Sequence, residues 1–381
     1  MRVGLISGEY PPLRGGVADY TANLKEALEQ LGIEAGVITS ARAGPRQDGV
    51  HPVIKGWGVS SWPAVARALV AMGAQVAHVQ YQAAAYGMSA AIHLLPWWLR
   101  RRCAVVTTFH DLRAPYLFPK AGPLRLWALK SLARGSDAVI VSNDEDWAEV
   151  SRWGPKVVRL IPIASNLPPS LPADYDRQAW RARLGVGADD PLLGYFGLLN
   201  QSKGVDTLLG AFRRLRELRP SARLLLIGDE VGASDPTNAA YRERVLGLMA
   251  RWGLDSAVTR TGYLPPGEAS AHLAACDVIA LPFSDGASLR RGSLMAVLAH
   301  GLPLVTTRPT RPCPLKDSEH CLLVARGDEQ ALAEAVERLL DSPSMRQRLA
   351  CGAAALSKAF SWPAIAAETG RLYGDLLEGR S

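Results

Sequence analysis

The stretch "RVGLISGEYPPLRGGVADYTANLKEALEQLG" (residues 2–32) joins a short apolar run to a helical pattern through a turn that contains two glycines. The run 2–7 is typical of a buried strand, and residues 20–32 have the apolar spacing of a helix that ends at Gly32. Similar apolar runs alternate with helical patterns through most of the chain. This alternation predicts an α/β fold in which parallel sheets carry helices on both faces.

The length and one proline-rich segment predict two domains. A chain of 381 residues exceeds the usual size of a single core. The alternation stops at "LPPSLPADYD" (167–176), which is typical of a connection, and then begins again. We therefore expect Rossmann-like, doubly wound domains at 1–170 and 187–357, joined by a linker at 167–186 and facing each other across a cleft. In such sheets ligands bind outside the carboxyl ends of the strands.

The composition is that of a soluble globular protein, with 48% hydrophobic and 21% charged residues. The net charge of +7 favours anionic ligands or lipid surfaces, or is simply a compositional bias. No long basic block occurs, so nucleic acid is not an expected partner. The five cysteines have no CxxC or metal-ligand spacing and are typical of reduced thiols. With no signal-peptide pattern and no apolar run long enough to span a membrane, we expect a cytoplasmic protein.

Three predicted strand ends carry groups suited to an anion or a sugar. Gly15 and Gly16 lie where a helix begins, so backbone N–H groups there can approach an anion. Lys203 precedes a second helix and can reach a phosphate. His110 follows a strand, where it can hydrogen-bond a sugar. Each has an ordinary alternative, namely a tight turn, a solvated lysine and a histidine packed in a loop.

The segment "SDGASLRRGSL" (284–294) places Arg290 and Arg291 directly before a predicted helix. Paired guanidinium groups there form either a solvated turn or the floor of an anion site, since arginine matches phosphate oxygens bidentately. Another loop begins at Gly262, also at a strand end, where backbone groups can contact a nucleobase. The order in which all these pieces occur decides how they are interpreted.

Four pieces, "EYPPLRGGVADYT", "FGLLNQSKGVDTLL", "ACDVIALPF" and "HGLPLVTT", resemble in this order the GT-B glycosyltransferases, specifically the retaining family 4. The segment "FSWPAIAAETGRLYGDLL" (360–377) resembles the C-terminal helix of that fold, which implies that 358–381 packs onto the N-terminal domain. The resemblance implies transfer of a sugar from a nucleotide-diphosphate sugar, bound by the C-terminal domain, to a hydroxyl of an acceptor bound by the N-terminal domain. It implies front-face substitution with retained configuration, without a metal or another cofactor.

The resemblance also implies roles for particular residues. Lys203 and one or both of Arg290 and Arg291 would stabilise the leaving diphosphate. The Gly16 N–H would add a donor, and His110 would contact the transferred sugar. The implied donor-binding residues are Gly15, Gly16, Gly197, Tyr263, Leu264, Asp285, Ser288, Gly292, Ser293 and Leu294, and the acceptor-side residues are Glu9 and Asp19.

The chain departs from the family pattern in its charges. Family members usually carry an arginine where this chain has Leu198, and a ribose-binding glutamate where it has Ala296. An earlier glutamate would fall at Ser288, and Asp285 is the only carboxylate nearby. Our hypothesis is that the paired arginines supply the relocated charge in a subgroup of the family.

Two other classes of function stay open. One is a nucleotide-sugar-binding homologue without turnover, which the two departures would explain. The other is a different GT-B enzyme, such as a nucleotide-sugar epimerase, although no matching acid–base carboxylates or pyridoxal lysine can be recognised. The acceptor would be a sugar, a small molecule or a lipid-linked molecule. The segment "HLLPWWLRRRC" (93–103) would suit a peripheral membrane contact, but Pro96 favours a buried helix end.

Overall fold

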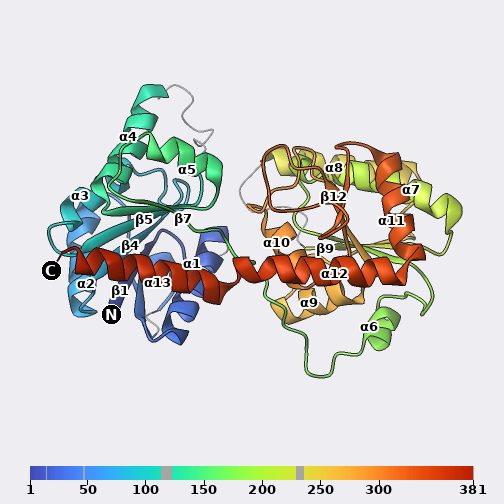
Figure 1. The fold of residues 1–381 in the computed structure, drawn as a ribbon, viewed down its shortest axis with the longest axis horizontal. Coiled ribbons are helices and arrows are strands. Elements are labelled where there is room, and N and C mark those ends of the chain that lie inside the picture. Colours follow the sequence, from blue (N-terminus) through green and yellow to red (C-terminus); the bar gives the residue numbers. More distant parts are fainter. Residues whose placement is uncertain (14, 46–47, 113–121, 229–235, 381) are drawn as a thin grey trace. The chain divides into compact units, whose positions relative to one another are not determined.

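Two compact units make up the chain (Figure 1). The computed structural model describes residues 1–13, 15–45, 48–112, 122–228 and 236–380. The first unit combines Met1–Asn166 with Trp362–Ser381, and the second is Leu167–Ser361. Each unit is a parallel sheet with flanking helices, so the predicted α/β class is confirmed.

The first unit contains a seven-stranded parallel sheet in the order β3-β2-β1-β4-β5-β6-β7. Its strands are β1 (Arg2–Ser7), β2 (Glu34–Ser40), β3 (Val50–Ile54), β4 (Val76–Tyr81), β5 (Ala104–Phe109), β6 (Ala138–Val141) and β7 (Val158–Leu160). The strand order reverses between β1 and β4. In doubly wound sheets, ligands bind at such a reversal, beyond the carboxyl ends of the two strands.

Helices bury apolar residues on both faces of this sheet. They are α1 (Gly16–Gln30), α2 (Trp62–Ala71), α3 (Leu95–Leu99), α4 (Gly122–Gly135), α5 (Asp144–Ser151) and α13 (Trp362–Glu378). One core contains residues of α1 and α13, and the other contains residues of α2, α3, α4 and α5. The predicted helix at 20–32 begins four residues earlier, because Val17 and Ala18 already pack in the interior.

Polar contacts tie the C-terminal helix α13 to the first unit. Trp362 donates its indole N–H to the Ser165 carbonyl at 2.8 Å. The Tyr373 hydroxyl lies 2.6 Å from Nδ1 of His78, a residue of β4 that is fully buried. The segment that we predicted to return, 358–381, therefore joins the first unit from Trp362 onward.

One helical stretch, Pro343–Glu378, is long and apolar enough to cross a membrane by length and composition alone. Our expectation from the sequence did not identify it, because polar residues interrupt its apolar run. Some of its apolar side chains are buried within the protein. Leu349 and Ala353 are buried in the second unit, and Ile365 and Ala366 in the first.

The second unit contains a six-stranded parallel sheet in the order β10-β9-β8-β11-β12-β13. Its strands are β8 (Leu192–Phe196), β9 (Arg223–Ile227), β10 (Val258–Arg260), β11 (Val278–Leu281), β12 (Leu304–Thr307) and β13 (Leu322–Val324). Its helices are α6 (Arg177–Arg183), α7 (Val205–Leu218), α8 (Pro236–Arg251), α9 (Pro266–Ala275), α10 (Gly292–Ala299), α11 (Glu329–Asp341) and α12 (Pro343–Ser357). Here the strand order reverses between β8 and β11, which makes the loops after these strands the expected ligand site.

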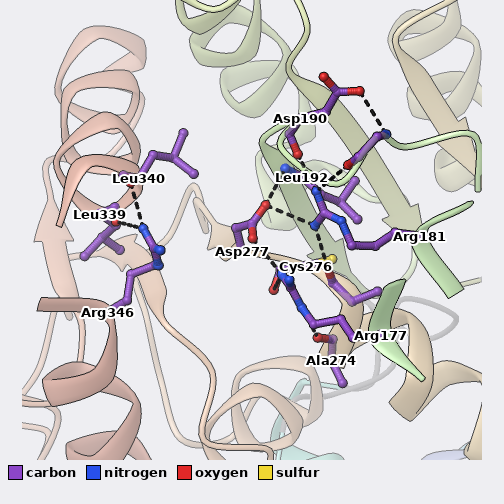
Figure 2. A network of polar contacts seen from close by, with 12 residues as sticks. Arg177, Arg181, Asp190, Leu192, Ala274, Cys276, Asp277, Leu339, Leu340 and Arg346 are labelled. Atoms are coloured by element: carbon purple, nitrogen blue, oxygen red, sulfur yellow. Dashed lines mark hydrogen bonds and ion pairs between the residues drawn. The ribbon is translucent and has the colours of Figure 1, made fainter. Parts of the chain in front are cut away.

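The range 167–186, which we predicted to be a linker, contains helix α6 and belongs to the second unit. Figure 2 shows how α6 is held. The Arg181 side chain is 2% exposed, and its guanidinium donates to Asp277 at 3.2 Å and to the Ala275 carbonyl at 3.0 Å. Arg177 reaches the other oxygen of Asp277 at 2.6 Å. Asp277 also accepts the Leu192 N–H at 2.8 Å, so one carboxylate joins α6 to the sheet.

We expect Asp277→Ala to lower the free energy of unfolding by about 3 kcal/mol, because it leaves a buried guanidinium without its anion. Urea unfolding measures this. The matched control is Asp341→Ala, which removes the partner of Arg219 from an exposed ion pair and should cost less than about 1 kcal/mol. Equal losses for the two variants would contradict a central role for Asp277.

Candidate functional site

Three glycines form the carboxyl edge of the second sheet. Gly197 follows β8, Gly228 follows β9 and Gly262 follows β10, with φ angles of +136°, +121° and +67°. A Cβ on Gly228 would lie 3.0 Å from the Gly197 carbonyl oxygen, and Gly228 forms a backbone bridge with Gly262. The positive φ angles disfavour side chains at these three positions, so backbone groups line the edge where a ligand would approach.

Lys203 and Ser293 converge on this edge. The Lys203 ammonium donates to Ser293 Oγ at 2.7 Å. A Cβ on Gly197 would lie 3.5 Å from both Lys203 Nζ and Ser293 Cβ. Burial and, to a smaller extent, the charge of Arg291 lower the pKa of Lys203 to about 8. The ammonium is still mostly charged at neutral pH, and a bound anion would offset both effects.

Arg291 lies beside Lys203 over one aromatic ring. Its guanidinium is 4.4 Å from the centroid of the Phe283 ring, and Lys203 Nζ is 5.2 Å from the same centroid. Arg291 forms an ion pair with Asp285 and donates to Ser202 Oγ at 3.2 Å. The structure therefore brings together two cations on a shared apolar surface, and the Asp285 carboxylate helps to fix one of them.

Helix α10 begins at this cationic pair. Its N-cap residue is Arg291, and no side chain caps the helix start. The N-terminal end of a helix attracts anions, because its first N–H groups have no partner within the helix. Ser293 and Leu294 are buried in the first turn, and Gly292 is exposed. An anion in this place would meet backbone N–H groups as well as two side-chain cations.

The other predicted donor-binding residues differ in their exposure and in their contacts. Tyr263 is exposed directly after Gly262, whereas Leu264 packs against the core of the unit. Ser288 Oγ accepts the Arg290 backbone N–H at 3.3 Å, which shapes the loop.

Some residues that hold this site in place were not predicted from the sequence. Ser202 and Phe283 hold Arg291, and Tyr195 donates to the Leu198 carbonyl at 2.8 Å, which supports the backbone after Gly197. Ser202 directly precedes Lys203 in the stretch "QSKG", so its position beside the predicted lysine could have identified it. Ala296, at the family's ribose-binding position, is fully buried and offers no polar side-chain group.

In the first unit, the turn at Gly15–Gly16 already holds a carboxylate. Glu9 accepts the backbone N–H groups of Val17 and Ala18 at the start of α1. A Cβ on Gly15 would lie 2.1 Å from Glu9 Oε1, so only glycine allows this approach. We predicted an anion-binding turn, and the protein fills part of it with its own acidic side chain. Gly16 itself has open space where a Cβ would be.

Burial raises the pKa of Glu9, although its two backbone hydrogen bonds oppose the effect. The nearby charge of Asp19 raises it further, and burial also raises the pKa of Asp19. Two carboxyl groups with weakened acidity thus lie at the end of β1, next to the reversal in strand order. Such groups accept hydrogen bonds from hydroxyls well.

His110, directly after β5, is held in a neutral form. Its Nε2 lies 2.9 Å from the side-chain oxygen of Gln80, so Nε2 carries the proton and Nδ1 remains an acceptor. The Tyr20 ring packs edge-on against it at 4.6 Å. Burial lowers the pKa of His110 to about 4. Gln80 was missed, although the polar residues of "VAHVQYQ" at alternate positions marked one face of a buried strand.

Among the described residues, no three or more His, Cys, Asp or Glu side chains are grouped as metal ligands.

Comparison with known proteins agrees with this arrangement. Residues 14–164 match the model of "Glycosyltransferase Family 4", and residues 190–342 match that of "Glycosyl transferases group 1". The chain belongs to glycosyltransferase family 4. The two matched ranges contain the first glycine turn's Gly15 and Gly16 and the second unit's Lys203 and Arg291.

Relatives with assigned activities are D-inositol 3-phosphate glycosyltransferases. That of Stackebrandtia nassauensis is 32% identical over 262 residues, which cover 65% of this chain and 56% of the relative. That of Corynebacterium efficiens is 27% identical over 417 residues, covering 98% and 95%. Several such matches span little more than half of the relative, with coverage from 54% to 58%.

Solved structures share the fold. Sucrose-phosphate synthase from Thermosynechococcus elongatus has a TM-score of 0.73 at 24% identity, covering 99% of each chain. HepE of Anabaena in complex with UDP-glucose has a TM-score of 0.68 at 16% identity, covering 98% of this chain and all of its own. Both are glycosyltransferases of the GT-B fold, with two Rossmann-like domains, so the predicted fold class is confirmed.

The buried histidines of the first unit generate a prediction about pH. Burial lowers the pKa of His78 to about 3 and that of His110 to about 4. The unfolded chain takes up protons on these residues below about pH 6.5, and the folded protein does not, so stability falls as pH falls from 6.5 towards 4. In His78→Gln the slope of the unfolding free energy against pH should decrease by up to about 1.4 kcal/mol per pH unit. Denaturant unfolding at pH 6.5, 5.5 and 4.5 measures this, and an unchanged slope would contradict a neutral, buried His78.

Proposed function

We propose that this family 4 protein transfers a sugar from a nucleotide-diphosphate donor to an acceptor hydroxyl, with retention of the anomeric configuration. The observation that carries the proposal is the placement of Lys203 and Arg291 over Phe283, at the glycine edge where the strand order reverses. Two cations and a free helix start suit a diphosphate better than a neutral ligand.

In this proposal the second unit stabilises the leaving group. Negative charge grows on the diphosphate as the glycosidic bond breaks, and fixed cations lower the energy of that state. Arg291 is already oriented by Asp285 and Ser202, so its fork needs little rearrangement to bind phosphate oxygens. Lys203 and the N–H groups of α10 complete the contacts. The nucleoside would lie towards Gly262 and the exposed Tyr263.

The first unit would bind the acceptor and the transferred sugar. The proton on His110 Nε2 is engaged by Gln80, so His110 would accept a hydrogen bond from a sugar hydroxyl through Nδ1. Glu9 and Asp19 would accept hydrogen bonds from the acceptor, since burial keeps both from being strongly solvated. The acceptor hydroxyl would attack on the face from which the diphosphate departs, and its proton would pass to the departing phosphate oxygen. No metal or other cofactor is part of this proposal, and the reaction would take place in the cytoplasm.

The donor and the acceptor are chosen for testing from the relatives. HepE was solved with UDP-glucose, so UDP-sugars come first. D-inositol 3-phosphate is the acceptor in the names of several relatives. In this chain Glu9 occupies the start of α1, so we expect an uncharged hydroxyl, rather than a phosphate, of the acceptor to lie there.

Donor binding is tested by thermal unfolding with UDP, GDP, ADP and dTDP and their glucose or mannose derivatives. A ligand at about 100 times its Kd adds about 2.7 kcal/mol to the stability of the folded state. We expect one nucleotide to raise the Tm of the wild type, and Arg291→Met to lose the effect. Stabilisation that survives in both Arg291→Met and Lys203→Met would show that the nucleotide binds elsewhere.

Turnover is tested by product release from the stabilising donor, with EDTA present. Removing one group that stabilises developing charge costs about 10²–10³ in rate, so Lys203→Met and Arg291→Met should each lower kcat by that factor. Arg290→Met should lose less, because Arg291 is the one that shares a ring with Lys203. Arg326→Met, an exposed arginine of the same unit, is the control. If the wild type binds a nucleotide-sugar and transfers its sugar to no acceptor, the result would favour a nucleotide-sugar-binding homologue without turnover. The departures from the family pattern at Leu198 and Ala296 agree with that alternative.

A further inference from the structure

Exposed apolar side chains gather on one part of the first unit. Leu124 and Trp127 of α4 are 71% and 60% exposed. Leu126 of α4, Leu94 directly before α3, and Trp97 of α3 are exposed as well. We call these five residues the tryptophan patch. Large apolar residues that are exposed together, rather than singly, mark a surface that contacts something else.

The geometry of α4 brings Leu124 and Trp127 of the patch onto the same face as Trp97. Positions 124, 127, 131 and 135 fall on one face of the helix, because they follow one another at spacings of three or four residues. The Trp97 indole N–H donates to the Ser131 carbonyl at 2.9 Å, and a Cβ on Gly135 would lie 2.7 Å from the ring. Trp97 therefore rests on the same face that Leu124 and Trp127 extend.

The two chain segments that carry the patch contain charges of one sign only. The segments 90–103 and 122–136, which contain α3 and α4, include six Lys or Arg residues and no Asp or Glu. The six are Arg100, Arg101, Arg102, Arg125, Lys130 and Arg134. The rest of the chain has the other 37 basic residues against 36 acidic ones. Nearly all of the net charge of +7 therefore belongs to these two segments. The acidic Asp137 that follows is buried and is paired with Lys156 and Arg380.

Aromatic rings and guanidinium groups are stacked here. Arg100 lies 4.4 Å from the centroid of the Trp97 ring, and Arg102 lies 4.1 Å from that of Trp98. Leu95 and Leu99 of α3 are buried, as we expected for a packed helix end, but Trp97 stays outside. Tryptophan with adjacent arginine suits the boundary between water and lipid, where the ring enters the headgroup region and the cation meets lipid phosphate.

We propose that the tryptophan patch docks this protein onto a membrane surface rich in anionic lipids. The contact lies in the headgroup layer, with exposed Trp and Leu side chains inserted and with the positive charge of the two segments attracting lipid phosphates. A second copy of the chain fits poorly, because a symmetric contact would bring the same six positive charges against one another. This inference does not rest on the proposed reaction, since it concerns α3 and α4 alone.

The test is flotation of the full-length protein with vesicles, without donor or acceptor. We expect binding to phosphatidylcholine vesicles that contain phosphatidylglycerol, little binding to phosphatidylcholine alone, and weaker binding at high salt. Arg101→Glu with Lys130→Glu should weaken binding about 100-fold. Trp127→Ala with Leu124→Ala should weaken it about 10-fold.

Matched controls separate the patch from general effects. Trp147→Ala removes an exposed tryptophan of α5 in the same unit, and Arg326→Glu with Arg348→Glu makes the same charge change in the second unit. Both should bind as the wild type does. Unchanged Tm values establish that the patch variants fold. The proposal is overturned if the wild type does not bind anionic vesicles at low salt, or if the patch variants and the control variants bind these vesicles equally. It is also overturned if sedimentation velocity finds a dimer that Trp127→Ala dissociates.

Discussion

The contact between two loops of the second unit determines its candidate site. A Cβ on Gly204 would lie 2.0 Å from the Pro282 carbonyl oxygen, so only glycine lets these backbones meet. The Ser284 N–H donates to the Ser202 carbonyl at 3.1 Å, and its hydroxyl donates to the Gln201 carbonyl at 3.0 Å. The loop after β8 is thereby fastened to the loop after β11. Without this contact the cations of the two loops would have no fixed separation.

Sequence patterns were sufficient for most of the fold and for part of the site. Alternating strand and helix signals predicted two parallel sheets, since buried parallel strands give short, continuous apolar runs. Helix α6 was missed because its surroundings are rich in proline and aspartate. It exists because Asp176 caps its start and Arg181 is buried against Asp277. A buried arginine looks like any surface arginine in a sequence.

The site was predictable only where neighbours in space are neighbours in sequence. Lys203 and Arg291 were recognised from local motifs, whereas Phe283, which lies under both, depends on a contact between distant loops. The same holds for Gln80 beside His110, whose hydrogen bond joins residues thirty positions apart. Residue type and local spacing identify candidates, but the register of one strand against the next decides which of them meet.

The two units have opposite charges at their strand reversals. The second unit has Lys203 and Arg291 there, and the first has Glu9 and Asp19. At the strand reversal of the second unit, the charge of Arg291 lowers the pKa of Lys203, and a bound anion would oppose that effect. At the reversal of the first unit, the charge of Asp19 raises the pKa of Glu9, and burial raises the pKa of both carboxyl groups. In the proposed reaction, a diphosphate and a neutral hydroxyl would therefore be distinguished by charge before any contact specific to one substrate is made. The positive charge on α3 and α4 lies apart from both sets of groups in the sequence, so membrane attraction and substrate binding can change independently.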